Sequence, residues 1–356
     1  MAGRRQHYLP RFLQRPFRYR ASDKQDYVHA HESTRSYTPS TMGLGQERDF
    51  YGSAAESSAD DNVTESENRL SEILNRLNTE SCSVSQGDQA LLVAALAVRS
   101  NKMRKSLEAM VRVFANEMAD LLQKYGVRQR EIEVYWSDKS KLEAMIQEEL
   151  KKMPPMPREI RTKVISLIKQ QWHGQRDQII FQMQVGVKAI ANEVFKRMDQ
   201  ESAHIADSAF RKVFEADPTI PQRVASLTEH YEFSVITACE GEEFILGDCA
   251  AVGFRADRSP RLPIGDLDND SPLDQIYLPI SPTRCIAAMR KGTSTWAQMT
   301  DINEASAALS HRFFISKSSE PANLTKLQSL IGVADPLASE EDMRSLLKKI
   351  YGTNRD

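Results

Sequence analysis

The hydrophobic periodicity of the chain changes near Glu229, and this change constrains the fold more than any other feature. From about residue 63 to residue 228, apolar residues recur three and four positions apart, which is the spacing of one helix face. Beyond Glu229 they fall into short β-branched or aromatic runs separated by turn residues. These runs are Tyr231–Ala238, Glu243–Leu246, Ile276–Ile280, Cys285–Met289 and Arg312–Ile315. The pattern predicts an α+β protein with a mainly antiparallel C-terminal sheet.

The helical block begins with a capping signal. Thr64 and Glu67 form a Thr-x-x-Glu capping box ahead of the apolar series at 70, 73, 74 and 77, so a helix is expected to start near Val63. The segment Ala90–Val98 is almost entirely apolar, which predicts a helix buried on every side. The apolar pattern continues as far as Leu121, so we expect this helix to run on toward Gly126.

Further helices complete a central bundle. One is expected from about Ser137 to Lys152, and Pro157 opens another that Gly174 would close. A third long helix is predicted from Asp177 onward. Two more are expected at the C-terminal end, near 324–331 and 339–351.

The region before the bundle is predicted to be an N-terminal arm followed by a β-hairpin. Strand-like Tyr27–His31 precedes Thr34–Tyr37, with turn-forming residues between and after them. At about 150 residues per domain, 356 residues allow roughly two domains or one large one. We therefore divide the chain into the arm and hairpin (1–62), a helical bundle (63–228) and a sheet region with C-terminal helices (229–356). The arm and hairpin are expected to pack on the C-terminal sheet.

Composition excludes several classes of protein. No apolar run approaches the roughly 20 residues that a membrane-spanning helix needs, so no membrane role is expected. The four cysteines include no Cys-x-x-Cys pair, which argues against a disulfide framework or zinc knuckle and favours the cytoplasm. The Gly-rich phosphate-loop, Gly-x-Ser-x-Gly and His-Glu-x-x-His patterns are also absent from the sequence.

The N-terminal segment is strongly cationic. Its first twenty residues hold six arginines and no acid, although the whole chain has a net charge of -2. Arginine binds phosphate oxygens in a fork, and aromatic rings among arginines can stack on bases. Nucleic acid is therefore a predicted partner, through Arg4, Arg5, Arg15 and Arg18. An organelle transit peptide is a weaker alternative, because the segment lacks Ser and Thr and contains two prolines.

The same segment is amphipathic. Pro10 can occupy the first turn of a helix, which places Arg11 and Arg15 together four residues apart. The simplest interpretation is that the apolar residues anchor the N-terminus in the core while the arginines stay in water. Those apolar residues are Tyr8, Leu9, Phe12, Leu13 and Phe17.

Five short motifs, taken in order, resemble the bacterial domain-of-unknown-function family DUF4238. They are Gln6–Leu13 (QHYLPRFL), the run Asp49-Phe50-Tyr51, the acidic capped helix at Glu65–Glu72, Phe244–Asp248 (FILGD) and Ile276–Pro282 (IYLPISP). Family members open with His-His-Tyr-Val-Pro-x-Phe and later carry Thr-Ser-Asp-Asn-Pro-Val before a Leu-Pro-Leu-Ser-Pro strand. The resemblance spans nearly the whole chain and implies an architecture and candidate residues, but no activity.

The chain departs from the family pattern at two places. Gln6 replaces the first histidine, and Cys249-Ala250 replace the Asn-Pro that follows the aspartate. If the missing histidine were a metal ligand or proton carrier, this member would be impaired. His7 and Asp248 both match the family.

The matching residues suggest a phosphodiesterase site. His7 lies among arginines that would lower its pKa and keep the imidazole neutral, as a general base requires. Asp248 could orient that ring or hold a divalent cation, and Arg11 could stabilise charge on a phosphoryl group. The structural alternative is that His7 caps a turn and Asp248 ends a strand. Arg99 is a secondary candidate, paired with Glu65 or Glu72 in the bundle.

Two metal-like patterns carry less weight. His29 and His31 would share one face of a strand, but no third ligand is visible in the sequence. Asp266–Asp270 imitates the start of a calcium loop, but the required Gly and Glu are missing. The sequence thus predicts a nucleic-acid-binding protein, with nuclease or phosphodiesterase activity of a bacterial or phage conflict system as the sharper hypothesis. The alternative is a non-catalytic protein whose Arg-rich arm docks on an acidic protein partner.

Overall fold

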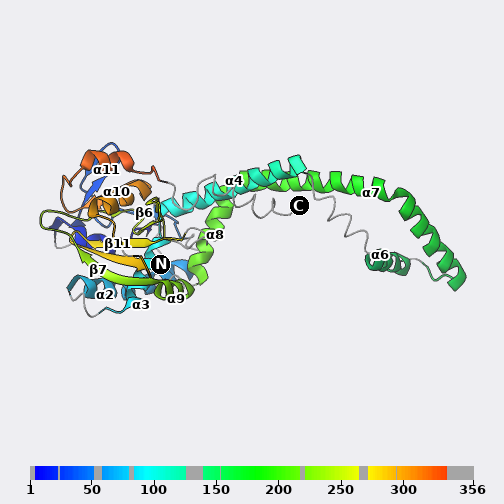
Figure 1. Cartoon of the computed structure of the whole chain (residues 1–356), viewed down its shortest axis with the longest axis horizontal. Helices are drawn as coiled ribbons and strands as arrows, with labels where there is room; N and C mark the ends of the chain where they lie inside the picture. Colours follow the sequence, from blue (N-terminus) through cyan, green and yellow to red (C-terminus); the bar gives the residue numbers. More distant parts are fainter. Residues whose placement is uncertain are drawn as a thin grey trace. The chain divides into compact units, whose positions relative to one another are not determined.

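The chain divides into two compact units (Figure 1). A computed structural model describes residues 5–22, 25–51, 58–79, 84–125, 139–152, 154–216, 221–263, 272–293 and 295–334. Unit 1 comprises Met1–Met110 and Ala203–Asp342, and unit 2 comprises Val111–Ser202 and Met343–Asp356. Both predicted β-rich ends of the chain therefore belong to unit 1.

Unit 1 is built around a five-stranded antiparallel sheet in the order β10-β9-β11-β12-β7. Its strands are β7 (Tyr231–Thr237), β9 (Val252–Phe254), β10 (Pro260–Arg261), β11 (Gln275–Ser281) and β12 (Arg284–Arg290). The central strands β11 and β12 are buried on both faces, whereas the edge strand β7 alternates at its start between buried and exposed positions. The α+β class and the antiparallel sheet predicted from the sequence are confirmed.

A second sheet joins the N-terminal hairpin to the C-terminal half of the chain. Its order is β5-β4-β13-β8, with β4 (His29–His31), β5 (Ser36–Tyr37), β8 (Leu246–Gly247) and β13 (Phe314–Ser316). Strand β4 pairs antiparallel with β5, which confirms the predicted hairpin. It also pairs with β13, nearly 300 residues later in the chain.

Helices cover both sides of the five-stranded sheet. In Figure 1, α2 (Ser58–Thr79), α3 (Gln86–Ala97) and α9 (Pro221–His230) lie on one side of it, and α10 (Met299–Leu309) and α11 (Leu324–Leu330) lie on the other. Helix α8 (Ser202–Ala216) also belongs to unit 1, apart from its first residue. Helix α3 is apolar around its whole circumference, and its residues from Gln89 to Ala97 are all buried, as the sequence predicts.

The N-terminal arm supplies the remaining strands of unit 1. Strand β1 (Arg5–His7) pairs with β6 (Gln46–Arg48), and β2 (Arg20–Ala21) pairs with β3 (Asp26–Tyr27). Between them lie the short helix α1 (Arg11–Gln14) and the 3-10 turn η1 (Arg15–Phe17). The arm's apolar side chains belong to the main hydrophobic core of unit 1.

The long helix expected from residue 90 to residue 126 is two helices. Helix α3 ends at Ala97 and α4 (Asn101–Tyr125) begins after Ser100. The Ser100 hydroxyl accepts the Met103 N–H at 3.1 Å, which satisfies one of the free amides at the start of α4. A capping serine therefore breaks a run whose hydrophobic pattern is continuous.

Unit 2 contains α6 (Lys139–Lys151) and the 43-residue helix α7 (Arg158–Gln200). The prediction that Gly174 closes a helix is wrong, because α7 passes through it. An internal glycine costs a helix only about 1 kcal/mol relative to alanine, and no proline follows to stop the helix. The predicted helix at 339–351 lies outside the described residues.

The predicted strand at Glu243–Leu246 is shorter than expected. Strand β8 begins at Leu246, because Asn303 of α10 takes the place of a strand partner before it. Its side-chain oxygen accepts the Ile245 N–H at 3.0 Å, and its amide donates to the Glu243 carbonyl at 2.9 Å. Strands β9 and β10 were not predicted. In the part of the chain that the structure describes, no helix has the length and hydropathy needed to cross a bilayer.

A tight contact between β8 and α10 makes Gly247 sensitive to substitution. A Cβ placed there would lie 2.5 Å from the Ser306 carbonyl oxygen and 2.6 Å from the Ser310 hydroxyl. We expect Gly247→Ala to destabilise unit 1 by about 2–3 kcal/mol, because backbone and helix must move apart. Thermal unfolding compares it with Gly43→Ala, whose Cβ would make only ordinary contacts with Ser40, at 3.7 and 3.8 Å. An equal loss in both variants would contradict the packing explanation.

Candidate nucleic-acid interface

The arginine arm, residues 5–22, is anchored by its apolar side. Leu9, Leu13 and Phe17 are fully buried, and Tyr8 and Phe12 are nearly so, which confirms the predicted anchor. Backbone bonds from Tyr8 and Leu9 to the Gly45 carbonyl fix the turn after β1. The side chain of Gln14 donates to the Leu9 carbonyl at 2.6 Å from inside the core. The cationic side of the arm is therefore held on a rigid base.

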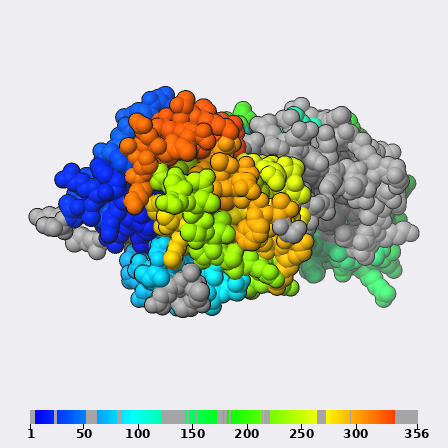
Figure 2. Space-filling view, turned by 60° about the vertical axis from the view of Figure 1, so that its left-hand side comes forward, coloured from blue at the N-terminus to red at the C-terminus, as the bar shows by residue number. Residues whose placement is uncertain are grey.

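Most of the arm's arginines reach solvent. Arg5, Arg15, Arg18 and Arg20 are exposed, and Arg11 is half-buried. Arg15 and Arg18 both pair with Asp26, at 3.4 and 3.1 Å, so one acid is shared by two guanidinium groups. Figure 2 shows the arm, in dark blue, at one edge of the visible face, beside orange and red residues from the C-terminal part of unit 1. Arg4, another predicted contact, lies outside the described residues.

Two arginines stand directly opposite each other in the ribbon formed by β1 and β6. Arg5 is the register partner of Arg48, and both are exposed. Like charges at facing positions of an antiparallel pair are unfavourable. Arg48 also pairs with Asp49 at 3.3 Å, which offsets part of that repulsion. An anion bound between the two guanidinium groups would remove the rest.

An exposed aromatic stack lies among the arginines. The Tyr19 ring lies on the His29 ring with centroids 4.0 Å apart and an angle of 24° between their planes. Tyr19 lies between Arg18 and Arg20 in the sequence, and its side chain is 41% exposed. Burial lowers the pKa of His29, which favours a neutral ring at pH 7. Proteins that bind single-stranded nucleic acid stack bases on exposed aromatic rings close to basic side chains, and Arg18 and Arg20 are the sequence neighbours of Tyr19.

His7 and Arg11 lie together, as predicted. Burial is the main reason that the pKa of His7 falls below its usual value; the charge of Arg11 adds to this, and the backbone of Met42 and Thr41 opposes it. The prediction of a lowered pKa is confirmed, but burial outweighs the arginines as its cause. Three buried polar atoms here lack a hydrogen-bond partner among the described residues: His7 Nε2, Arg11 Nε and Thr41 Oγ1. Because these three atoms are buried, they do not contact a ligand bound on the surface of the arm.

Asp248 has structural partners of its own. Its two carboxylate oxygens accept the N–H groups of His311 and Arg312 at 2.7 and 2.9 Å, and its own N–H donates to Phe313. It is buried, and burial raises its pKa to about 6 while these amides oppose the shift. In the described part of the chain, no hydrogen bond or ion pair joins it to His7. The structure thus gives Asp248 the role of holding the chain before β13.

The two departures from the family motifs have structural explanations. Gln6 is buried, and its side-chain oxygen accepts the Tyr51 N–H at 2.6 Å, so it fixes the chain after β6. Ala250 has a φ of 63°, a left-handed value that a proline ring cannot adopt. The turn after Asp248 therefore differs from one built on Asn-Pro.

Arg99 is buried inside unit 1. Its side chain has no exposed area, and it donates to Glu67 and Ser66 of α2, each at 2.9 Å. The predicted partners Glu65 and Glu72 are not the ones it uses. A substrate cannot reach a guanidinium group with this burial, so the contacts assign Arg99 to packing α2 against the end of α3.

The histidines of β4 do not form a metal site. His31 is buried between two hydroxyl groups, with Ser36 at 2.8 Å from Nδ1 and Ser316 at 2.8 Å from Nε2. Burial lowers its pKa to about 4, so the ring is neutral at pH 7. Across the ranges described above, no three His, Cys, Asp or Glu side chains gather in a way that could hold a metal ion. The predicted calcium-like segment at 266–270 lies outside those ranges.

The sequence prediction omitted four residues of this surface. Tyr19 and Arg20 continue the Arg-aromatic pattern of the arm, and that pattern was the available signal. His29 and Arg48 carried no such signal, because strand pairing and ring stacking bring them to the arm from elsewhere in the chain.

Comparison with known proteins gives one match. A family model described as "Protein of unknown function (DUF4238)" matches residues 5–320. The match begins at β1 and ends after β13, so it covers the arm, both larger sheets and the helices between them. No curated protein and no solved structure matches the chain.

Proposed function

The chain belongs to the DUF4238 family of proteins of unknown function, and we propose that it binds single-stranded nucleic acid through its arginine arm. The observation that carries the proposal is the stack of the exposed Tyr19 on His29, on an arm where Arg18 and Arg20 adjoin Tyr19 in the sequence. Bases stack on exposed rings, while guanidinium groups pair with the phosphates that link them.

The charge distribution supports a local site on the arm. Residues 5–22 include five arginines and no acid, whereas the rest of the chain is net acidic. Duplex-coating proteins need a broad basic surface, and a short strip suits a few phosphates of a single strand. The facing pair Arg5 and Arg48 adds a position where a phosphate would relieve repulsion.

The proposal covers binding and does not include cleavage. A phosphodiesterase of the predicted kind needs His7 to work with Asp248 or with a cation that Asp248 holds. Both oxygens of that carboxylate accept backbone N–H groups instead. In this proposal the partly exposed side chains of His7 and Arg11 lie at one end of the binding surface.

Fluorescence anisotropy with a labelled oligothymidine tests the proposal. We expect the logarithm of the binding constant to fall linearly with the logarithm of salt concentration, by about 0.7 per phosphate contacted. The Arg5→Gln/Arg20→Gln variant should lower that slope by about 1.4. Tyr19→Ala should weaken binding by about 1–3 kcal/mol, since a stacking platform is lost.

The matched control is Tyr19→Phe, which keeps the ring and should bind like the wild type. Binding that ignores both salt and Tyr19→Ala would overturn the proposal and leave the arm as a docking surface for an acidic protein. Strand scission by the wild type in the presence of Mg²⁺, and its loss in His7→Ala, would add a nuclease step to the binding.

A further inference from the structure

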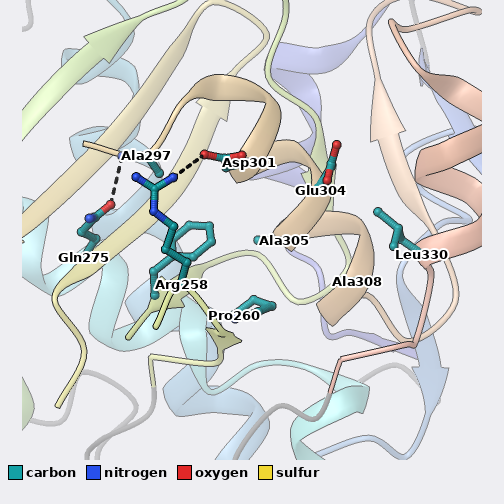
Figure 3. A pocket seen from close by; sticks show the side chains of 10 residues that line it. Arg258, Pro260, Gln275, Ala297, Asp301, Glu304, Ala305, Ala308 and Leu330 are labelled. Carbon is teal, nitrogen blue, oxygen red and sulfur yellow. Dashed lines mark hydrogen bonds and ion pairs between the residues drawn. The ribbon is translucent and has the colours of Figure 1, made fainter. Parts of the chain in front are cut away.

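A hollow lies in unit 1 between the five-stranded sheet and the helices α10 and α11 (Figure 3). Its volume is about 250 Å³, and its lining comes from β9, β10, β11, α10 and α11 and from the turn and loop next to β10 and α10. Pockets for drug-sized ligands typically measure about 300–1,000 Å³, so this hollow suits a smaller molecule.

The walls of the hollow are mostly apolar. Helix α10 presents Ala305 and Ala308, three residues apart and therefore on one face, and their small side chains leave the space open. Phe254 of β9, Pro260 of β10 and Leu330 of α11 close the other sides. Such walls bind an aliphatic or aromatic group by removing its surface from water.

Charged groups of both signs stand at the same hollow. In Figure 3, the guanidinium of Arg258 points toward the carboxylate of Asp301, and Glu304 lies farther along α10. The Arg258–Asp301 pair is long, at 3.5 Å, and the side chains are 65% and 39% exposed. Glu304 is paired with Lys326 on its other side. A long, exposed pair such as Arg258–Asp301 contributes little to stability, so a ligand can replace it at low cost.

Arg258 is held in an unfavourable backbone conformation. Its φ is 64°, a left-handed value that side chains other than glycine or asparagine seldom adopt. The turn that fixes it is closed by bonds from Arg258 to the Arg255 carbonyl and from Ser259 to the Asp257 side chain. Strained residues of this kind gather where a side chain must be placed for binding. The strain here presents a guanidinium group to the hollow.

Gln275, the remaining polar side chain of the hollow, is already hydrogen-bonded within the protein. The Gln275 oxygen accepts from the Tyr277 hydroxyl at 2.8 Å and from the Ala297 N–H at 3.0 Å, and its amide donates to the Thr295 carbonyl at 2.6 Å. Asp301 also caps α10, because its Oδ2 accepts the Gln298 N–H at 3.3 Å. Recognition of a ligand's polar end falls to Arg258, Asp301 and Glu304.

From this arrangement we propose that the hollow binds a free α-amino acid with an apolar side chain. Arg258 takes the carboxylate through its fork of N–H donors, and the acids of α10 take the ammonium group. The apolar side chain fills the space above Ala305 and Ala308. A simple carboxylic acid is a poorer ligand, because its single charge would also face Asp301 and Glu304. A simple amine is poorer as well, since it leaves Arg258 without the carboxylate.

Isothermal titration calorimetry of the full chain with L-phenylalanine and L-leucine tests the proposal. We expect at least one of them to bind with a Kd of about 1 mM or tighter, which corresponds to a modest free energy for a small ligand. Phenethylamine and 3-phenylpropionate, which carry one charge each, should bind at least tenfold more weakly than the amino acid.

Two variants locate the site. Arg258→Gly removes the guanidinium and suits the left-handed backbone, so it should weaken amino-acid binding at least tenfold while thermal stability is kept. Ala308→Leu should abolish binding by filling the hollow. Failure of both amino acids to bind the wild type would overturn the proposal. Unchanged affinity in Arg258→Gly, or equally tight binding of 3-phenylpropionate, would do so too. The oligonucleotide affinity of the arm is expected to stay the same in both variants, so this test is independent of the proposed function.

Discussion

An Asp248→Ala variant is expected to lose about 3–5 kcal/mol of the stability of unit 1 at pH 5. The substitution leaves the part-buried N–H groups of His311 and Arg312 without their acceptors, and each unpaired group costs up to about 1–3 kcal/mol. It also opens a small cavity at a position that is 1% exposed. Hydrogen-exchange protection of the β11 and β12 amides measures the loss within unit 1 itself.

The stability lost in Asp248→Ala should become smaller as pH rises. Burial raises the pKa of Asp248 to about 6 in the folded protein, against about 3.9 in the unfolded chain. The folded state therefore holds the proton more tightly, and stability falls as pH rises through this window. Since one pKa unit corresponds to about 1.4 kcal/mol, the loss caused by Asp248→Ala should shrink by about that amount between pH 5 and pH 8.

The matched control for this prediction is Asp257→Ala. Asp257 also accepts one backbone N–H, from Ser259 at 2.8 Å, but it lies on an exposed turn. Water replaces its carboxylate there, so the loss should stay below about 1 kcal/mol at both pH values. A loss of that small size in Asp248→Ala would contradict the structural role given to Asp248 and reopen its catalytic one.

A Glu67→Ala variant is expected to lower the free energy of unfolding by about 3–5 kcal/mol, because it leaves the buried guanidinium of Arg99 without its ion-pair partner. Arg99 has no exposed side-chain area, whereas Glu67 is 30% exposed and can be solvated alone. Removing the acid should therefore lower stability more than removing the arginine does. We expect Arg99→Met, which keeps the length and packing of the side chain, to cost less than Glu67→Ala.

The double variant Arg99→Met/Glu67→Ala completes a thermodynamic cycle. It should be more stable than Glu67→Ala alone, since no charge remains buried. The same exchange measurement on the α3 amides reports all three variants. If Glu67→Ala proves the mildest of them, water reaches Arg99 in the folded state and the burial argument fails.

The sequence predicted the elements of this protein better than it predicted their neighbours. Local patterns were enough for strands β7, β11 and β12 and for helix α3, because alternation and continuous apolar runs reflect burial directly. The same patterns predicted one continuous helix across Ser100 and a helix end at Gly174, and both predictions were wrong. Both depend on small energies, a single capping bond and one glycine penalty, that tertiary context decides.

For the candidate sites too, the sequence predicted local properties and the tertiary structure decided which residues meet. Sequence alone determined that the N-terminal arm is cationic on one side and apolar on the other, because both properties belong to residues a few positions apart. The tertiary structure decided that Asp248 holds the chain before β13, that Tyr19 stacks on His29, and that Arg258 faces α10 across a hollow. Each of these depends on segments far apart in the chain that meet only when the strands pair. A single sequence carries no direct record of that pairing.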